Sequence, residues 1–202
     1  GADLGGVAWY GWVTSAFFLG TMIGIVFAGD QADRRGAGRP YVIGLLLFAL
    51  GLVIGGLAPS MPVLVVGRFV QGFGAGVVPA IGYVAISRAF SVQERPRMFA
   101  ILSTAWVVPG LVGPVLAERI AQGIGWRWVF LGLLPLVLAA GLVVVPAMMR
   151  IGPVADRDPV AVPFLRRRLV EAVRVAVGTA MIVAGLTFAR LLLVPAVVLG
   201  LA

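Results

Sequence analysis

Charged side chains gather in one short stretch of this chain. Residues 29–39 read GDQADRRGAGR and include five charged residues, although only 12% of the 202 residues are charged. Gly29 and Gly36 permit a tight backbone turn. Asp33 can accept hydrogen bonds from helix N-termini or pair with a nearby arginine. The candidate partners are Arg34, Arg35 and Arg39. The stretch therefore predicts a polar turn, held together by its own charges or simply solvated.

Arg68 is a single charge inside a long apolar segment, residues 63–87. If this segment crosses a bilayer, an arginine in hydrocarbon costs at least ~2.5 kcal/mol, so it should face a protein or water-filled interior. Gln71 and Gly72 follow at i+3 and i+4, on the same face of a helix. This polar stripe suits a cavity wall. Alternatively, Arg68 reaches the membrane interface, since it lies only ~8 Å along the helix from Met61.

The residue types exclude most catalytic chemistry. The chain contains no histidine and no cysteine, so it lacks the commonest general base and metal ligand and cannot form a disulfide. Ser87 and Ser103 lack a partner that could act as a base. We therefore expect no enzyme activity, no bound metal and no cofactor.

The segments that carry these residues are strongly hydrophobic. Hydrophobic residues make up 61% of the chain, whereas a soluble domain contains about 45–50%. A membrane-spanning helix needs roughly 20 apolar residues. Five complete spans have about this length, at residues 9–28, 41–58, 63–87, 98–117 and 126–149. A sixth runs from about 169 to 186, and a seventh begins at 191. Because the spans show no strict alternation, we expect an all-α, polytopic membrane helix bundle.

The arginines indicate how the chain crosses the bilayer. Loops on one side of the spans carry eleven arginines, and the opposite loops carry only Arg119 and Arg127 before the sixth span. Because cytoplasmic loops are enriched in basic residues, we expect residues 29–39 to be cytoplasmic and residue 1 to lie outside, in a multi-pass protein of the plasma membrane. Topology in the lipid bilayer then explains the net charge of +8, and we expect no nucleic-acid partner.

The polar segment 151–168 is the natural boundary within the chain. It contains four arginines, two aspartates and three prolines. We expect a membrane bundle at residues 1–149, a cytoplasmic linker at 150–168 and the start of further membrane helices at 169–202. The chain begins without Met and ends inside an apolar run, so we expect it to be an internal piece of a longer protein.

Small residues predict close helix packing. Gly20 and Gly24 form one G-x-x-x-G pattern, and Gly72 and Gly76 form another. Such patterns let two helices approach closely. Further along the chain, Pro114 should kink the fourth span because it removes a backbone hydrogen bond.

Several motifs together resemble those of the major facilitator superfamily. GDQADRRGAGR resembles its G-x-x-x-D-R-x-G-R/K loop between helices 2 and 3, and GRFVQGFGAG resembles its R-x-x-Q-G-x-G-A motif on helix 4. PGLVGPVLA resembles the G-x-x-x-G-P antiporter motif of helix 5, with Gly110 one place later than the motif's first glycine. WRWVFLGLLP looks like the start of helix 6 in drug-exporting members. The motifs follow one another in family order, and the first span then corresponds to helix 2.

The resemblance implies a partial major facilitator fold, built from inverted three-helix repeats and lacking helix 1. It implies a secondary transporter for proton-coupled efflux of drugs or small metabolites by alternating access. The partners would be the small-molecule substrate, protons and the missing helices. Gating would involve the loop residues Gly29, Asp33, Arg34, Gly36 and Arg39. The cavity and substrate or proton coupling would involve Arg68, Gln71, Gly72 and Gly74, and the antiporter motif Gly110, Gly113 and Pro114.

Two alternatives remain open at this point. The first is an importer of a sugar or a small anion, in which Arg68 would hold the anion. The second is an inactive fragment of a transporter that inserts into the membrane but moves nothing.

Overall fold

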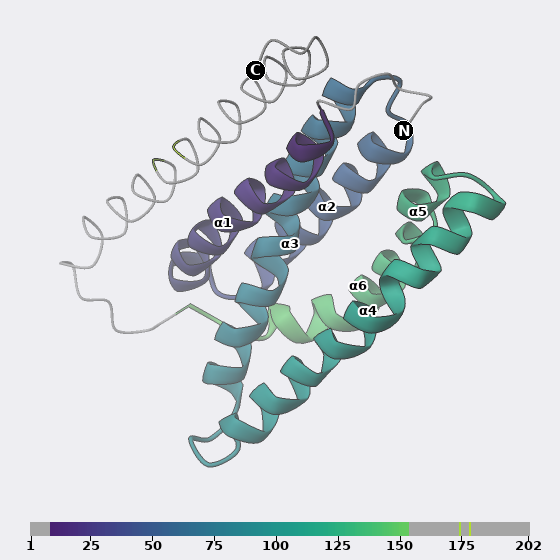
Figure 1. Ribbon diagram of the computed structural model, residues 1–202. Coiled ribbons are helices and arrows are strands. Elements are labelled where there is room, and N and C mark those ends of the chain that lie inside the picture. The colour runs from purple at the N-terminus through teal and green to yellow at the C-terminus, as the bar shows by residue number, and fades with distance from the viewer. Residues whose placement is uncertain (1–8, 154–173, 175–177, 179–202) are drawn as a thin grey trace, which may run out of the picture.

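The computed structural model describes residues 9–153, together with 174 and 178, and this part of the chain is a helical bundle without strands (Figure 1). Its helices are α1 (Tyr10–Arg35), α2 (Gly38–Gly56), α3 (Met61–Ala89), α4 (Arg95–Gly123), α5 (Arg127–Leu131) and α6 (Leu134–Met149). Five segments are long and apolar enough to cross a membrane, with α5 and α6 counting as one segment. This confirms the expected all-α membrane bundle. Apart from 174 and 178, the sixth and seventh expected spans and the linker beyond residue 153 lie outside the described residues.

The turn between α1 and α2 is shorter than the sequence predicts. Helix α1 continues to Arg35, so Gly29 and Asp33 are helical and Gly29 does not form the turn. Gly36 ends the helix with a φ of 79°, in the left-handed region that glycine adopts without strain. Only Gly36 and Ala37 separate α1 from α2.

The connection between α3 and α4 is a capped turn. The Glu94 carboxylate accepts hydrogen bonds from the Ser91 backbone N–H (3.1 Å) and the Ser91 hydroxyl (2.7 Å). The Ser91 hydroxyl donates to the carboxylate instead of accepting from the Glu94 N–H, which bonds to the Ser91 carbonyl, so only the carboxylate half of an S-x-x-E capping box is formed. Pro96 lies in the first turn of α4, where its missing N–H costs nothing.

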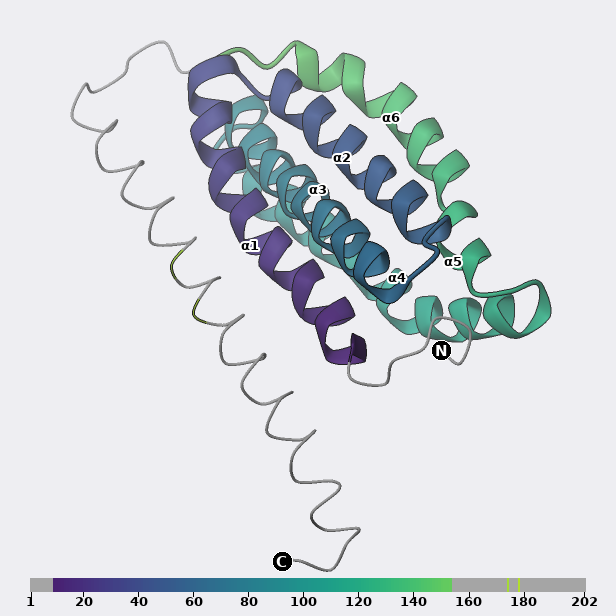
Figure 2. The same cartoon turned by 90° about the horizontal axis from the view of Figure 1, so that it is seen from above.

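Helix α3 lies between α1 and α2 and packs along both (Figure 2). At the α1 contact a side chain on Gly72 would overlap the Phe17 carbonyl oxygen, and one on Gly76 would overlap that of Thr21. On the α1 side, a Cβ at Gly20 would lie 2.8 Å from the Phe73 backbone nitrogen. The backbones therefore approach directly, which confirms the predicted G-x-x-x-G packing.

Helices α5 and α6 pack on α2, whereas α4 stands apart. Helix α4 touches α5 and α3, and none of the described residues in its apolar window is buried. It diverges from α3 beyond their connecting loop (Figure 1). It runs as one helix through Pro114, so this proline does not end it.

Candidate functional site

The Arg68 side chain is held by neutral groups between α3 and α1. Its Nη1 donates a 2.7 Å hydrogen bond to Gln71 Oε1, and its Nε donates a 3.4 Å hydrogen bond to the Val13 carbonyl. Its guanidinium carbon lies 4.2 Å from the centroid of the Phe17 ring, close enough for a cation–π interaction. Among the described residues no carboxylate forms an ion pair with Arg68.

Gln71 and its neighbouring glycines lie in helix contacts. Gln71 is only 5% exposed, and a Cβ added at Gly51 of α2 would lie 2.5 Å from the Gln71 Cα atom. Gly72 faces the backbone of α1, and Gly74 faces Gly44 and Phe48 of α2. The sequence predicted a cavity wall here, but in this structure Gln71, Gly72 and Gly74 are packing residues. Only the Arg68–Gln71 pairing at i and i+3 follows the sequence pattern.

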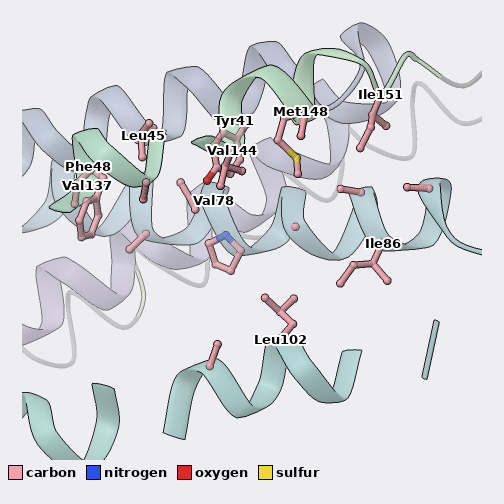
Figure 3. Close-up of a pocket in the computed structure, with 18 of the residues that line it drawn as sticks. Tyr41, Leu45, Phe48, Val78, Ile86, Leu102, Val137, Val144, Met148 and Ile151 are labelled. Atoms are coloured by element: carbon pink, nitrogen blue, oxygen red, sulfur yellow. The ribbon is translucent and has the colours of Figure 1, made fainter. Parts of the chain in front are cut away.

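A large apolar cavity lies beside this site, between α2, α3, α4 and α6. Its volume is about 1080 Å³. Leu45 and Phe48 of α2, Leu102 of α4 and Val144 of α6 contribute to its lining, and Leu102 faces Ile86 of α3 (Figure 3). Apart from Tyr41, Trp106 and Arg150, the lining side chains carry no polar group. Arg68 and Gln71 are not among the lining residues.

Phe17 connects the cavity with Arg68. Its ring contributes to the cavity lining and also stacks against the Arg68 guanidinium.

Asp33 pairs across the bundle rather than within its own stretch. Its Oδ1 accepts a 2.8 Å ion-pair hydrogen bond from Arg88 Nη2, at the end of α3. The pairing predicted with the arginines of the same stretch is therefore wrong. Arg34 instead pairs with Asp30, one turn earlier on α1, and Arg39 is exposed at the start of α2. Sequence reasoning missed Arg88, because 55 residues separate it from Asp33 and no local pattern links them.

The end of α6 covers the α1–α2 turn. The Ala37 N–H donates a 3.0 Å hydrogen bond to the Ile151 carbonyl. A Cβ at Gly36 would lie 2.6 Å from that same oxygen. Gly36 is therefore required both by its backbone conformation and by the space that Ile151 takes.

The three residues of the antiporter-like motif lie apart from both charged sites. Gly110 and Gly113 are on α4, and a Cβ at either position would meet no heavy atom within 4 Å. Pro114 is exposed within the same helix. The structure does not bring these residues together with Arg68 or Asp33. Within the part of the chain described, no group of metal-ligating side chains is present.

Comparisons with known proteins agree with this architecture. The family model of the Major Facilitator Superfamily matches residues 1–202. A probable multidrug-efflux transporter of Mycobacterium tuberculosis (strain H37Rv) is 34% identical over 153 residues, which is 76% of this chain and 32% of the relative.

Two further relatives come from other organisms. Multidrug resistance protein 3 of Bacillus subtilis (strain 168) is 31% identical over 129 residues, covering 64% of this chain and 25% of the relative. An MFS-type transporter of the acurin A biosynthesis cluster of Aspergillus aculeatus is 29% identical over 168 residues, covering 83% of this chain and 29% of the relative. The chain thus spans about a third or less of the length of each of these relatives.

Proposed function

Because the chain belongs to the major facilitator superfamily, we propose that it forms part of a secondary active transporter that exports drugs or small metabolites. We further propose that export is coupled to protons and proceeds by alternating access. Relatives named as multidrug-efflux transporters support the substrate class. Five segments of membrane-spanning length support a location in the bilayer.

The hydrogen-bonding environment of Arg68 is the main support for the proposal. A guanidinium holds its charge at any physiological pH, so Arg68 cannot carry a proton itself. It can stabilise the ionised form of a carboxylate that does. In this structure Arg68 donates its hydrogen bonds to two neutral acceptors, the Gln71 side chain and the Val13 carbonyl. In our proposal Arg68 exchanges these acceptors for a carboxylate, or for an anionic substrate group, supplied elsewhere in the intact transporter.

Asp33 and Arg88 are proposed to form the gate on the cytoplasmic side. They join the end of α1 to the end of α3, at the end of the bundle that carries most of its arginines. That end holds Arg34, Arg35, Arg39, Arg88, Arg95, Arg97 and Arg150, whereas the opposite end holds Arg119 and Arg127. The positive-inside rule supports placing the richer end in the cytoplasm. Breaking the ion pair would remove the charged link between the ends of α1 and α3.

The apolar cavity is proposed to take another helix of the intact transporter. In an inverted repeat, the first three helices correspond to the next three. With α1 as the second family helix, α3 is the fourth, and it packs between α1 and α2. Its counterpart, the first helix, should then pack between α4 and α6, where the cavity lies. This also accounts for the absence of buried residues in α4.

The test is a transport assay on the intact parent gene. Inverted membrane vesicles are given an imposed pH gradient, and uptake of a fluorescent lipophilic compound is followed with wild type, Arg68→Ala and Asp33→Asn. We expect gradient-dependent uptake in wild type and at least a tenfold loss in both variants, at equal membrane levels. Asp30→Asn is the matched control, because Asp30 pairs only within α1, and it should keep most of the activity.

The results separate the parts of the proposal. Uptake that is unaffected when the gradient is abolished would contradict proton coupling. Full activity of Arg68→Ala would contradict the role of Arg68 but leave export standing. No uptake of any compound in a broad panel would contradict multidrug export.

Import of a small anion is the second candidate function. The absence of a carboxylate partner for Arg68 among the described residues favours it, since a guanidinium bonded only to neutral acceptors can exchange them for an anion. Vesicles of both orientations distinguish the two functions. An importer accumulates its anion in right-side-out vesicles, and an exporter accumulates its substrate in inverted ones.

A further inference from the structure

Arg88 of α3 bonds to two other segments at one end of the bundle. Its Nη2 donates to the Asp33 carboxylate, 2.8 Å away. Its Nη1 donates to two backbone carbonyls at 3.1 Å each, that of Ala32 in α1 and that of Gly152 after α6. Its side chain is only 19% exposed. One guanidinium thus joins the end of α1, the end of α3 and the exit of α6.

Packing around this arginine holds the exit of α6 in the same place. Ile151 accepts a hydrogen bond from the Ala37 N–H, and Met148 and Ile151 pack against a buried cluster that includes Ala32, Ala37 and Ile81. A Cβ at Gly38 would overlap Met149. The residues after α6 therefore lie directly on the turn that carries the proposed gate.

We propose that Arg88 is a positioning residue that fixes the α6 exit, residues 150–153, on the α1–α2 turn and couples it to Asp33. The Asp33 carboxylate accepts from Nη2 and the Gly152 carbonyl accepts from Nη1 of the same rigid, planar guanidinium. If Asp33 leaves Arg88, the guanidinium loses its charged partner and is held only by its Nη1 hydrogen bonds to the Ala32 and Gly152 carbonyls. Opening the gate would then loosen the α6 exit as well. The consequence for transport rests on the function proposed above, but the coupling itself does not.

A distance measurement on this chain tests the coupling without any transport. The sequence contains no cysteine, so cysteines introduced at Gln93 and Pro153 are the only sites for spin labels. Both positions are exposed, one in the α3–α4 loop and the other after α6. Pulsed electron-spin resonance on the purified chain in lipid nanodiscs gives their distance distribution.

We expect one narrow distance in the parent chain. Arg88→Gln should broaden the distribution and shift it to longer distances. Arg88→Lys should do the same, because an ammonium cannot reproduce the fork. Asp33→Asn should also broaden it, to a smaller extent, since the carbonyl bonds survive. Arg34→Gln is the matched control, because it removes an arginine that pairs only within α1, and its distribution should stay narrow.

Three outcomes would overturn the proposal. A narrow distribution in Arg88→Gln would show that Ile151 and its neighbours hold the exit without Arg88. Broadening in Arg88→Gln but not in Asp33→Asn would show that Arg88 holds the exit independently of the gate. Equal broadening in Arg34→Gln would show a general loss of structure, which circular dichroism of each variant checks separately. If the intact transporter fails to export any compound, these distances are unaffected, so the two failures are distinguishable.

Discussion

Helices α3 and α4 are each 29 residues long and both qualify as membrane spans, but they are packed in opposite ways. Helix α3 buries ten of its residues against α1 and α2. Helix α4 buries none of the residues in its apolar window. Their compositions are similar, since each contains internal glycines and at least one internal proline. What differs is whether another helix lies against the glycines.

The comparison shows that a glycine pattern supports close helix packing only where a second helix lies against it. Gly72 on α3 faces the Phe17 carbonyl so closely that a side chain has no room, while Gly113 on α4 faces open space. Small residues stabilise a helix pair only where two backbones meet. In the described part of the chain no helix lies against Gly110 and Gly113 of α4.

The first prediction concerns filling the α1–α3 contact. Gly72→Ala should destabilise the bundle by about 1–3 kcal/mol, the usual cost of overpacking a well-packed core, because the atom it meets belongs to the backbone. Gly113→Ala should be neutral or stabilise by up to about 1 kcal/mol through helix propensity. Thermal unfolding of both variants in the same detergent, followed by circular dichroism, measures the difference. Equal midpoints would contradict the packing contrast.

The second expected effect compares two leucines of the same size. Leu52 is fully buried on α2, whereas Leu111 on α4 is 74% exposed. Leu52→Ala should cost about 2–5 kcal/mol, because it leaves a cavity. Leu111→Ala should change the stability by less than about 0.5 kcal/mol, as for surface substitutions. Denaturation of this chain in mixed micelles tests both. A large cost for Leu111→Ala would mean that α4 is packed in this chain after all.

The smallest expected effect concerns the turn that connects the two helices. Hydrogen bonds donated by the Ser91 hydroxyl and backbone N–H lower the pKa of Glu94 below its ordinary value. A lowered pKa means that the ionised carboxylate adds stability at neutral pH, and that this contribution disappears as the pH falls from about 5 through the lowered pKa. Glu94→Gln should therefore melt slightly lower than wild type at pH 7.

The pH dependence is the check on this assignment. The difference in melting temperature between wild type and Glu94→Gln should shrink towards zero in acid. In a Ser91→Ala background the hydroxyl donor is already absent. Glu94→Gln should then lower the melting temperature at pH 7 by much less than it does in wild type. A gap that stays constant from pH 7 to pH 3 would rule out the ionised carboxylate as its source.

Much of the bundle could be predicted from local sequence. Long apolar runs predict membrane helices because a bilayer leaves backbone groups no other partners. The α1–α3 approach followed from two G-x-x-x-G patterns, and the membrane fold and its family followed from motifs in order along the chain. The helix boundaries at the charged stretch were less accurate, because helix α1 continues through Gly29 and four charged residues before Gly36 stops it.

Three features follow from local sequence: which segments are long and apolar enough to cross a membrane, where the chain turns at Gly36, and which residues are small enough for helices to meet. These are properties of single segments, set by hydrophobicity, backbone freedom and side-chain size. Only the tertiary structure decided that Asp33 pairs with Arg88, that Gln71 is buried between helices, and that the α6 exit lies on the α1–α2 turn. Each of these depends on which helix lies beside which, and residues far apart along the chain meet only after the helices have packed.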